Sequence, residues 1–283
     1  MSSVDLNGKR VTYADTGSGE AVLLLHSSAN SGAQWRSLME MLQASYRLLA
    51  PDLYGYGETD PWPSNVPLRL TDEAALIDAV LARCDRPIHL IGHSYGAAVG
   101  LRFAIEQPER LLSLTLIEPV AFHLLRGAPV GTTEHNLYRE IAEIAAAVAN
   151  AAVRGDDRGG MAKFIDYWNG VGSWMRMKPE LQAALAKCTA KVALDFAATM
   201  TDPTPIDALR RIAVPTVVMR GNASPHPTRR IAELVAEVLP QARLRTIEGA
   251  GHMLTVTHRE AVNMVIAEHL FRSMAVRKRP AAA

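Results

Sequence analysis

The chain has 283 residues, with 30 Lys and Arg against 29 Asp and Glu and a formal net charge of +1. Because the charge is close to zero, no basic surplus is present to attract a phosphate backbone, and nucleic acid is not expected as a partner. Hydrophobic residues make up 48% of the chain and charged residues 21%, which excludes a solvated, disordered chain and favours a globular protein with a buried core.

Targeting, membrane and metal signals are weak throughout the sequence. The first residues do not form a basic segment followed by an apolar one, and no stretch approaches the roughly 18 apolar residues that a membrane span requires. We therefore expect a cytoplasmic protein without membrane contact. The two cysteines, Cys84 and Cys188, do not form a C-x-x-C pair, so neither a disulfide framework nor a metal cage is expected.

Short apolar runs bounded by turn residues recur along the chain and predict buried strands. They lie at residues 22–25, 46–50, 88–91, 114–117, 216–219 and 244–247. Apolar residues at helical spacing separate most of these runs, and they predict helices over 34–44, 71–83, 97–107, 227–238 and 259–273. Alternating strands and helices predict an α/β protein with a mostly parallel, doubly wound sheet that helices cover on both faces.

The alternation stops between residues 121 and 205, where no strand is predicted and helical spacing prevails. Apolar residues from Leu137 to Ala152 recur at i, i+4, i+7, i+8 and i+11, which predicts an amphipathic helix that ends near Gly155. Two glycines and two tryptophans in 167–174 indicate a bent, aromatic-rich corner. We interpret 121–205 as an inserted helical unit, with residues 1–120 and 206–283 forming the α/β core.

The sharpest local signal is residues 88–98, IHLIGHSYGAA, in which a predicted strand runs through G-x-S-x-G into a predicted helix. Such a nucleophile elbow forces the central serine, Ser94, into a strained turn, and side chains at Gly92 or Gly96 would crowd it. The turn presents the hydroxyl at the carboxyl end of the sheet, beside a helix N-terminus that favours negative charge. We therefore predict that Ser94 is a nucleophile.

A serine hydroxyl needs a base whose pKa lies near neutral pH, and histidine meets that requirement. Of the nine histidines, His252 lies in IEGAGHM (247–253), at the mouth of the last predicted strand, where two glycines let the loop fold over the sheet edge. We predict that His252 is the base. His93 is expected to point away from the site, and His26 and His226 are weaker candidates.

With these motifs in place, the chain resembles the α/β-hydrolase superfamily over nearly its whole length. Residues 26–35, HSSANSGAQW, are similar to the family's H-G-x-x-x-S-x-x-x-W segment, with Ser27 in the usual glycine position. Residues 51–59, PDLYGYGET, are similar to its D-x-x-G-x-G-x-S loop, in which Asp52 corresponds to a structural aspartate. The resemblance implies the α/β-hydrolase fold, with 121–205 as a helical cap over the site.

The resemblance also implies an oxyanion hole, which is formed by the backbone N–H groups of Tyr95, after the nucleophile, and of Ser28, two residues after the first motif's histidine. Such donors stabilise the charge of a tetrahedral intermediate. Trp168, Trp174 and Met175 of the insertion are candidates for lining the pocket.

A serine–histidine pair usually has a third residue, an acid that orients the histidine, and the position of this acid departs from the family pattern. Members usually carry an aspartate after the strand at 216–219, but the sequence there reads RGNASP (220–225) and Ser224 occupies the acid's position. A serine cannot stabilise an imidazolium by charge. Glu118, which ends the strand after the nucleophile strand, resembles the alternative arrangement of some α/β hydrolases and is predicted as the acid. The fallback candidates are Asp195, Asp202 and Asp207, whereas Glu248 is interpreted as a strand residue.

A serine at the elbow excludes the aspartate-nucleophile mechanisms of the related dehalogenases and epoxide hydrolases. We therefore expect a serine hydrolase that cleaves a small carboxylic ester through an acyl-enzyme. Hydrolysis of C–C bonds or lactones remains open, as does cofactor-free oxygenation, peracid formation or lyase chemistry. A ligand-binding scaffold with a decayed triad is the non-enzymatic alternative. No dinucleotide or Walker motif appears, so the expected partner is a small-molecule substrate, with no cofactor and no metal.

Overall fold

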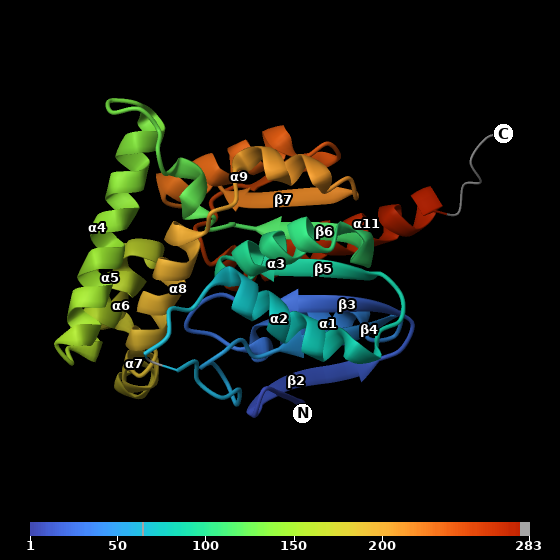
Figure 1. Cartoon of the computed structure of the whole chain (residues 1–283), viewed down its shortest axis with the longest axis horizontal. Coiled ribbons are helices and arrows are strands. Elements are labelled where there is room, and N and C mark those ends of the chain that lie inside the picture. The colour runs from blue at the N-terminus through green and yellow to red at the C-terminus, as the bar shows by residue number, and fades with distance from the viewer. Residues whose placement is uncertain (64, 278–283) are drawn as a thin grey trace.

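The computed structural model describes residues 1–63 and 65–277. Its described part contains one sheet in the order β1-β2-β4-β3-β5-β6-β7-β8 (Figure 1). The strands are β1 Ser2–Leu6, β2 Lys9–Gly17, β3 Glu20–Leu25, β4 Tyr46–Pro51, β5 Ile88–His93, β6 Leu111–Ile117, β7 Thr216–Gly221 and β8 Ala242–Ile247. The β1–β2 and β2–β4 pairs are antiparallel, and the remaining pairs are parallel. The predicted mostly parallel sheet is confirmed.

Helices cover both faces of this sheet, as expected of a doubly wound fold. Residues from α2 (Leu70–Val80), α3 (Tyr95–Glu106) and α9 (His226–Val238) share one hydrophobic core with one face of the sheet. Residues from α1 (Arg36–Leu42) and α11 (Arg259–Arg277) share a second core with the opposite face. A short helix, α10 (Leu254–Thr257), precedes α11.

Between β6 and β7 the described chain is helical. It holds α4 (Thr133–Val153), α5 (Asp157–Asn169), α6 (Ser173–Arg176), α7 (Pro179–Ala186) and α8 (Thr189–Thr201), which we call the helical insertion. In Figure 1 these helices stand together beside one end of the sheet. The amphipathic segment became α4, and Gly155 beyond it has a φ of 71°. The assignment of 121–205 as a domain apart from the core stays a prediction.

The predicted corner at 167–174 is formed by the end of α5 and the start of α6. Gly170 and Gly172 have φ values of 91° and 81°, which a residue with a Cβ adopts only with strain. Trp168 and Trp174 flank the corner and are buried, but Met175 is 77% exposed. The expectation that Met175 lines a pocket is therefore wrong, because its side chain lies on the solvent side of the short helix α6.

The sequence pattern did not predict β1 and β2. Residues of β1 alternate between half-buried and exposed positions, and β2 has a buried stretch only in its middle. These strands form the antiparallel edge of the sheet, where one face or one end contacts water, so they lack the continuous apolar run that identifies a central parallel strand.

Candidate active site

Ser94 lies at the sharp turn between β5 and α3, as the elbow motif predicts. Its φ is +55° and its ψ is −115°, outside the regions that residues with side chains ordinarily occupy. A Cβ at Gly92 would collide with the carbonyl oxygen of Gly96, and one at Gly96 would collide with that of Leu25. The two glycines therefore permit the close packing of strand and helix that the turn requires.

The structure brings Ser94, His252 and Glu118 together from three separate loops. His252 Nε2 lies 2.9 Å from Ser94 Oγ, and His252 Nδ1 lies 3.1 Å from Glu118 Oε2. All three residues are buried, with Glu118 at 0% exposure. An ionised carboxylate can only accept, so the hydrogen-bond pattern assigns the proton to Nδ1 and leaves Nε2 free to accept the hydroxyl proton of Ser94.

Glu118 occupies the end of β6, and its backbone is strained as well, with a φ of 50°. The other carboxylate oxygen, Oε1, accepts hydrogen bonds from the Gly221 backbone N–H at 2.6 Å and from the Ser224 hydroxyl at 2.7 Å. Burial raises the pKa of Glu118, but the hydrogen bonds from His252, Ser224 and Gly221 outweigh burial and hold this pKa below its usual value. The loop after β7 thus lacks an acid of its own but supports the carboxylate of Glu118 with two donors.

The remaining histidine candidates have other contacts. His93 points away from Ser94 and contacts the backbone carbonyl of His252 through Nε2 at 2.9 Å, and burial lowers its pKa to about 3. His26 accepts the Leu53 amide through Nε2 at 2.9 Å, and burial lowers its pKa to about 4. Both are therefore neutral structural groups, and His226 is exposed at the start of α9.

The alternative acids contact residues other than His252. Asp195 pairs with Lys191, Asp202 lies within ion-pair distance of Arg102 and His123, and the exposed Asp207 pairs with Arg210. Asp52 accepts from the backbone N–H groups of Gly32 and Glu58 and from Thr12, as expected of a structural loop aspartate. Glu248 is exposed and hydrogen-bonded to Asn222.

Both predicted oxyanion residues lie next to the cavity that Ser94 lines. Tyr95 is the first residue of α3, and a helix leaves the amides of its first turn without internal partners. The backbone N–H of Ser28 has no acceptor within the described residues. Ser28, together with Ser94 and Tyr95, lines a small cavity.

This inner cavity has a volume of about 20 Å³, room for about one water molecule. Its apolar wall includes Val120, Phe122, Phe164, Trp168, Val192 and Phe196. A second, outer groove of about 730 Å³ is lined in part by His252 and Ser224. Trp168 lines both spaces, so this residue borders the inner cavity and the groove alike.

The placement of Trp168 confirms that it lines a pocket, but its contact with the histidine was not predicted. The indole stacks on the His252 ring, with ring centroids 4.0 Å apart and planes 27° apart. Trp174 is buried elsewhere, with Arg158 over its ring. No sequence pattern relates position 168 to position 252, because the contact depends on how the helical insertion folds back on the sheet.

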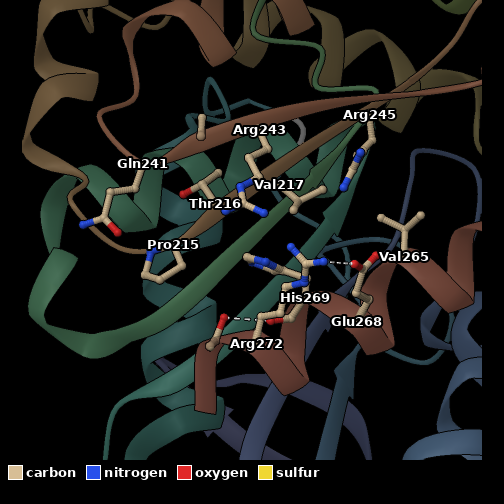
Figure 2. A pocket seen from close by; sticks show the side chains of 12 residues that line it. Pro215, Thr216, Val217, Gln241, Arg243, Arg245, Val265, Glu268, His269 and Arg272 are labelled. Carbon is tan, nitrogen blue, oxygen red and sulfur yellow. Dashed lines mark hydrogen bonds and ion pairs between the residues drawn. The ribbon is translucent and has the colours of Figure 1, made fainter. Parts of the chain in front are cut away.

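A separate hollow of about 350 Å³ lies at the other end of the sheet, between β7, β8 and α11 (Figure 2). Its lining includes Pro215 and Gln241, which precede β7 and β8, so it lies at the amino ends of these parallel strands. Arg243 and Arg245 border it, and Arg272 pairs with Glu268 there. It contains none of the predicted catalytic residues.

No group of three or more potential metal ligands gathers among the described residues. Within the same part of the chain, no helix is long and apolar enough to cross a membrane.

The sequence matches the family described as "Alpha/beta hydrolase family" over residues 22–265. The chain belongs to this family. The predicted α/β-hydrolase fold is thereby confirmed, and the architecture of sheet and covering helices agrees with it.

Two curated relatives each match part of the chain. It is 31% identical over 134 residues to a 2-hydroxy-6-oxo-6-phenylhexa-2,4-dienoate hydrolase of Comamonas testosteroni, covering 46% of this chain and 47% of that protein. It is 32% identical over 114 residues to a haloalkane dehalogenase of Agrobacterium fabrum, covering 40% of this chain and 37% of that protein. The chain thus spans less than half the length of these relatives.

Solved structures match nearly the whole chain. An esterase from Thermogutta terrifontis has a TM-score of 0.74 at 23% identity, covering 96% of this chain and 98% of that one. An enol-lactonase from Burkholderia xenovorans has a TM-score of 0.77 at 16% identity, covering 95% and 100%. At these identities the similarity establishes the fold but does not extend to the substrate.

Proposed function

We propose that the protein is a serine hydrolase that cleaves small carboxylic esters through an acyl-enzyme. The observation that carries this proposal is the continuous hydrogen-bonded chain from Ser94 through His252 to Glu118, buried at the carboxyl ends of β5 and β6. The aspartate-nucleophile chemistry of haloalkane dehalogenases does not apply, because the elbow residue is a serine.

In the proposed reaction, Ser94 Oγ attacks the carbonyl carbon while His252 Nε2 takes the hydroxyl proton. Glu118 stabilises the resulting imidazolium through the Nδ1–H hydrogen bond. The backbone N–H groups of Ser28 and Tyr95 hold the oxyanion. Collapse of the intermediate expels the alcohol, which receives the proton from Nε2. Water then attacks the acyl-enzyme while Nε2 takes its proton. Collapse of this second intermediate returns the proton to Ser94 Oγ and releases the carboxylic acid.

The two spaces beside the triad suggest which part of the ester each accommodates. The inner cavity, with room for about one water molecule, leaves space against its aromatic wall for no more than the single methyl group of an acetyl ester. The outer groove of about 730 Å³ has room for a larger alcohol. We therefore expect a preference for short acyl groups and tolerance of varied leaving groups.

Turnover of p-nitrophenyl acetate by the wild type and by Ser94→Ala tests the proposal. Ser94→Ala should abolish turnover, whereas Ser113→Ala removes a buried hydroxyl that contacts His89 on β5 and should leave turnover nearly unchanged. Lactones and β-diketones assayed in parallel define the bond that is cleaved. Turnover of either class at a far higher kcat/KM than any ester would contradict the ester assignment.

A further inference from the structure

A buried charged network joins the helical insertion to the core beside the inner cavity. Lys191 of α8 contacts Glu73 of α2 through Nζ at 3.1 Å, and it also pairs with Asp195 one turn further along α8. The exposures of Glu73, Lys191 and Asp195 are 0%, 7% and 3%. Two carboxylates and one ammonium therefore meet in the same water-excluded place.

Both predicted oxyanion residues are bound to this network through their side chains. The Ser28 hydroxyl donates to Asp195 Oδ2 at 2.5 Å, and the Tyr95 hydroxyl donates to Glu73 Oε1 at 3.2 Å. Lys191 Nζ lies 4.6 Å from the centroid of the Tyr95 ring, within the range of a cation–π contact. A single lysine of the helical insertion thus bridges the partners of both oxyanion residues.

The turn that carries Ser28 is held on its other side as well. Tyr56 donates to the same Asp195 oxygen at 2.6 Å, and Ala29 directly follows Ser28 in this turn. Ala29 has a φ of 55°, a conformation that residues with a Cβ adopt only when the surroundings enforce it. Asp195 therefore holds a strained turn whose amide must point at the reacting oxygen.

The charges of the network are compatible with holding the turn that carries Ser28. Burial alone would lower the pKa of Lys191, but the charges of Asp195 and Glu73 outweigh it and raise this pKa, so the lysine stays charged. A buried ion network is weak support for stability, since apolar residues would often serve as well, but it can fix a unique geometry. Here the network contacts the two residues whose backbone amides hold the oxyanion in the proposed reaction, and the positions of those amides determine how well they bind it.

We propose that Lys191 and Asp195 are positioning residues that align the backbone amides of Ser28 and Tyr95, so that the oxyanion hole is complete only when the helical insertion is seated on the core. This inference rests on the proposed function. It assigns to α8 a role in the transition state that differs from lining the pocket.

Ser28→Ala is the sharpest test, because it keeps the backbone N–H and removes only the hydrogen bond to Asp195. Misplacing one donor by about 1 Å costs about 100-fold in rate, so we expect kcat for p-nitrophenyl acetate to fall about 10-fold to 100-fold with KM nearly unchanged. Ser28→Thr, which restores a hydroxyl, should recover most of the loss. The matched control is Ser113→Ala, which removes a buried serine hydroxyl far from the site.

Asp195→Asn completes the design as a double-mutant cycle with Ser28→Ala. If both act through the same amide, their effects on kcat are not additive, and the double variant is nearly as active as the worse single one. Ser94-dependent turnover in the wild type with kcat unchanged in Ser28→Ala would overturn this inference alone. Wild type without Ser94-dependent turnover would overturn the proposed function, and this inference with it.

Discussion

Replacing Glu118 by glutamine should disable the proposed triad through the tautomer of His252. In the native protein Glu118 Oε1 accepts two hydrogen bonds, from the Gly221 amide and the Ser224 hydroxyl. Because the Gly221 N–H can only donate, a glutamine must keep its carbonyl oxygen on that side and turn its NH₂ group toward His252 Nδ1. The imidazole can then accept that hydrogen bond only with its own proton on Nε2, where it cannot take the proton of Ser94.

The expected loss is about 10,000-fold in kcat, the effect of forcing the wrong tautomer in a serine triad, or about 5 kcal/mol of transition-state stabilisation. Progress curves with a p-nitrophenyl ester measure it, and circular dichroism verifies folding. Glu248→Gln is the matched control, because it removes a carboxylate from the strand end next to the His252 loop. If Glu118→Gln keeps kcat within about threefold of the wild type in folded protein, the tautomer argument fails and Glu118 is not the acid.

Two further predictions follow from the burial and packing of the same site. Trp168→Ala opens the inner cavity to the outer groove, so the ratio of kcat/KM for the butyrate ester to that for the acetate ester should rise at least about 10-fold; an unchanged ratio would show that Trp168 does not limit acyl length. The lowered pKa of Glu118 stabilises the folded state above its usual value of 4.5, and this contribution is lost as pH falls through the folded-state pKa. In denaturant unfolding between pH 7 and pH 3, the stability advantage of the wild type over Glu118→Gln should therefore shrink toward low pH; a gap that widens instead would contradict the pKa direction.

The central sheet could be predicted because its strands are buried on both faces. Continuous apolar runs such as 22–25 and 88–91 lie within β3 and β5, and glycines with a steric role mark the elbow. The exposed edge strands β1 and β2 carry no such run. Their pairing with the core depends on contacts that are distant in the sequence.

The site also has features that local sequence patterns predict and features that only the folded chain brings together. The positions of Ser94 and His252 follow from local loop patterns, and Glu118 followed from the absence of an acid at Ser224. That Ser224 instead donates to Glu118 Oε1 could not be predicted, because it depends on the register of β6 against β7. The stacking of Trp168 on His252 and the contact of Lys191 with Glu73, 118 residues away in sequence, arise only when the helical insertion packs on the core.

The most direct test of the account is the reaction of a fluorophosphonate with the wild-type protein, followed by intact mass and peptide mapping. This reagent reports an activated serine without knowledge of the substrate. We expect rapid labelling of one site per chain at Ser94, and this labelling should slow sharply in Glu118→Gln. If Ser94 stays unlabelled in folded wild-type protein, the proposed triad is contradicted, and the ligand-binding scaffold becomes the hypothesis to test.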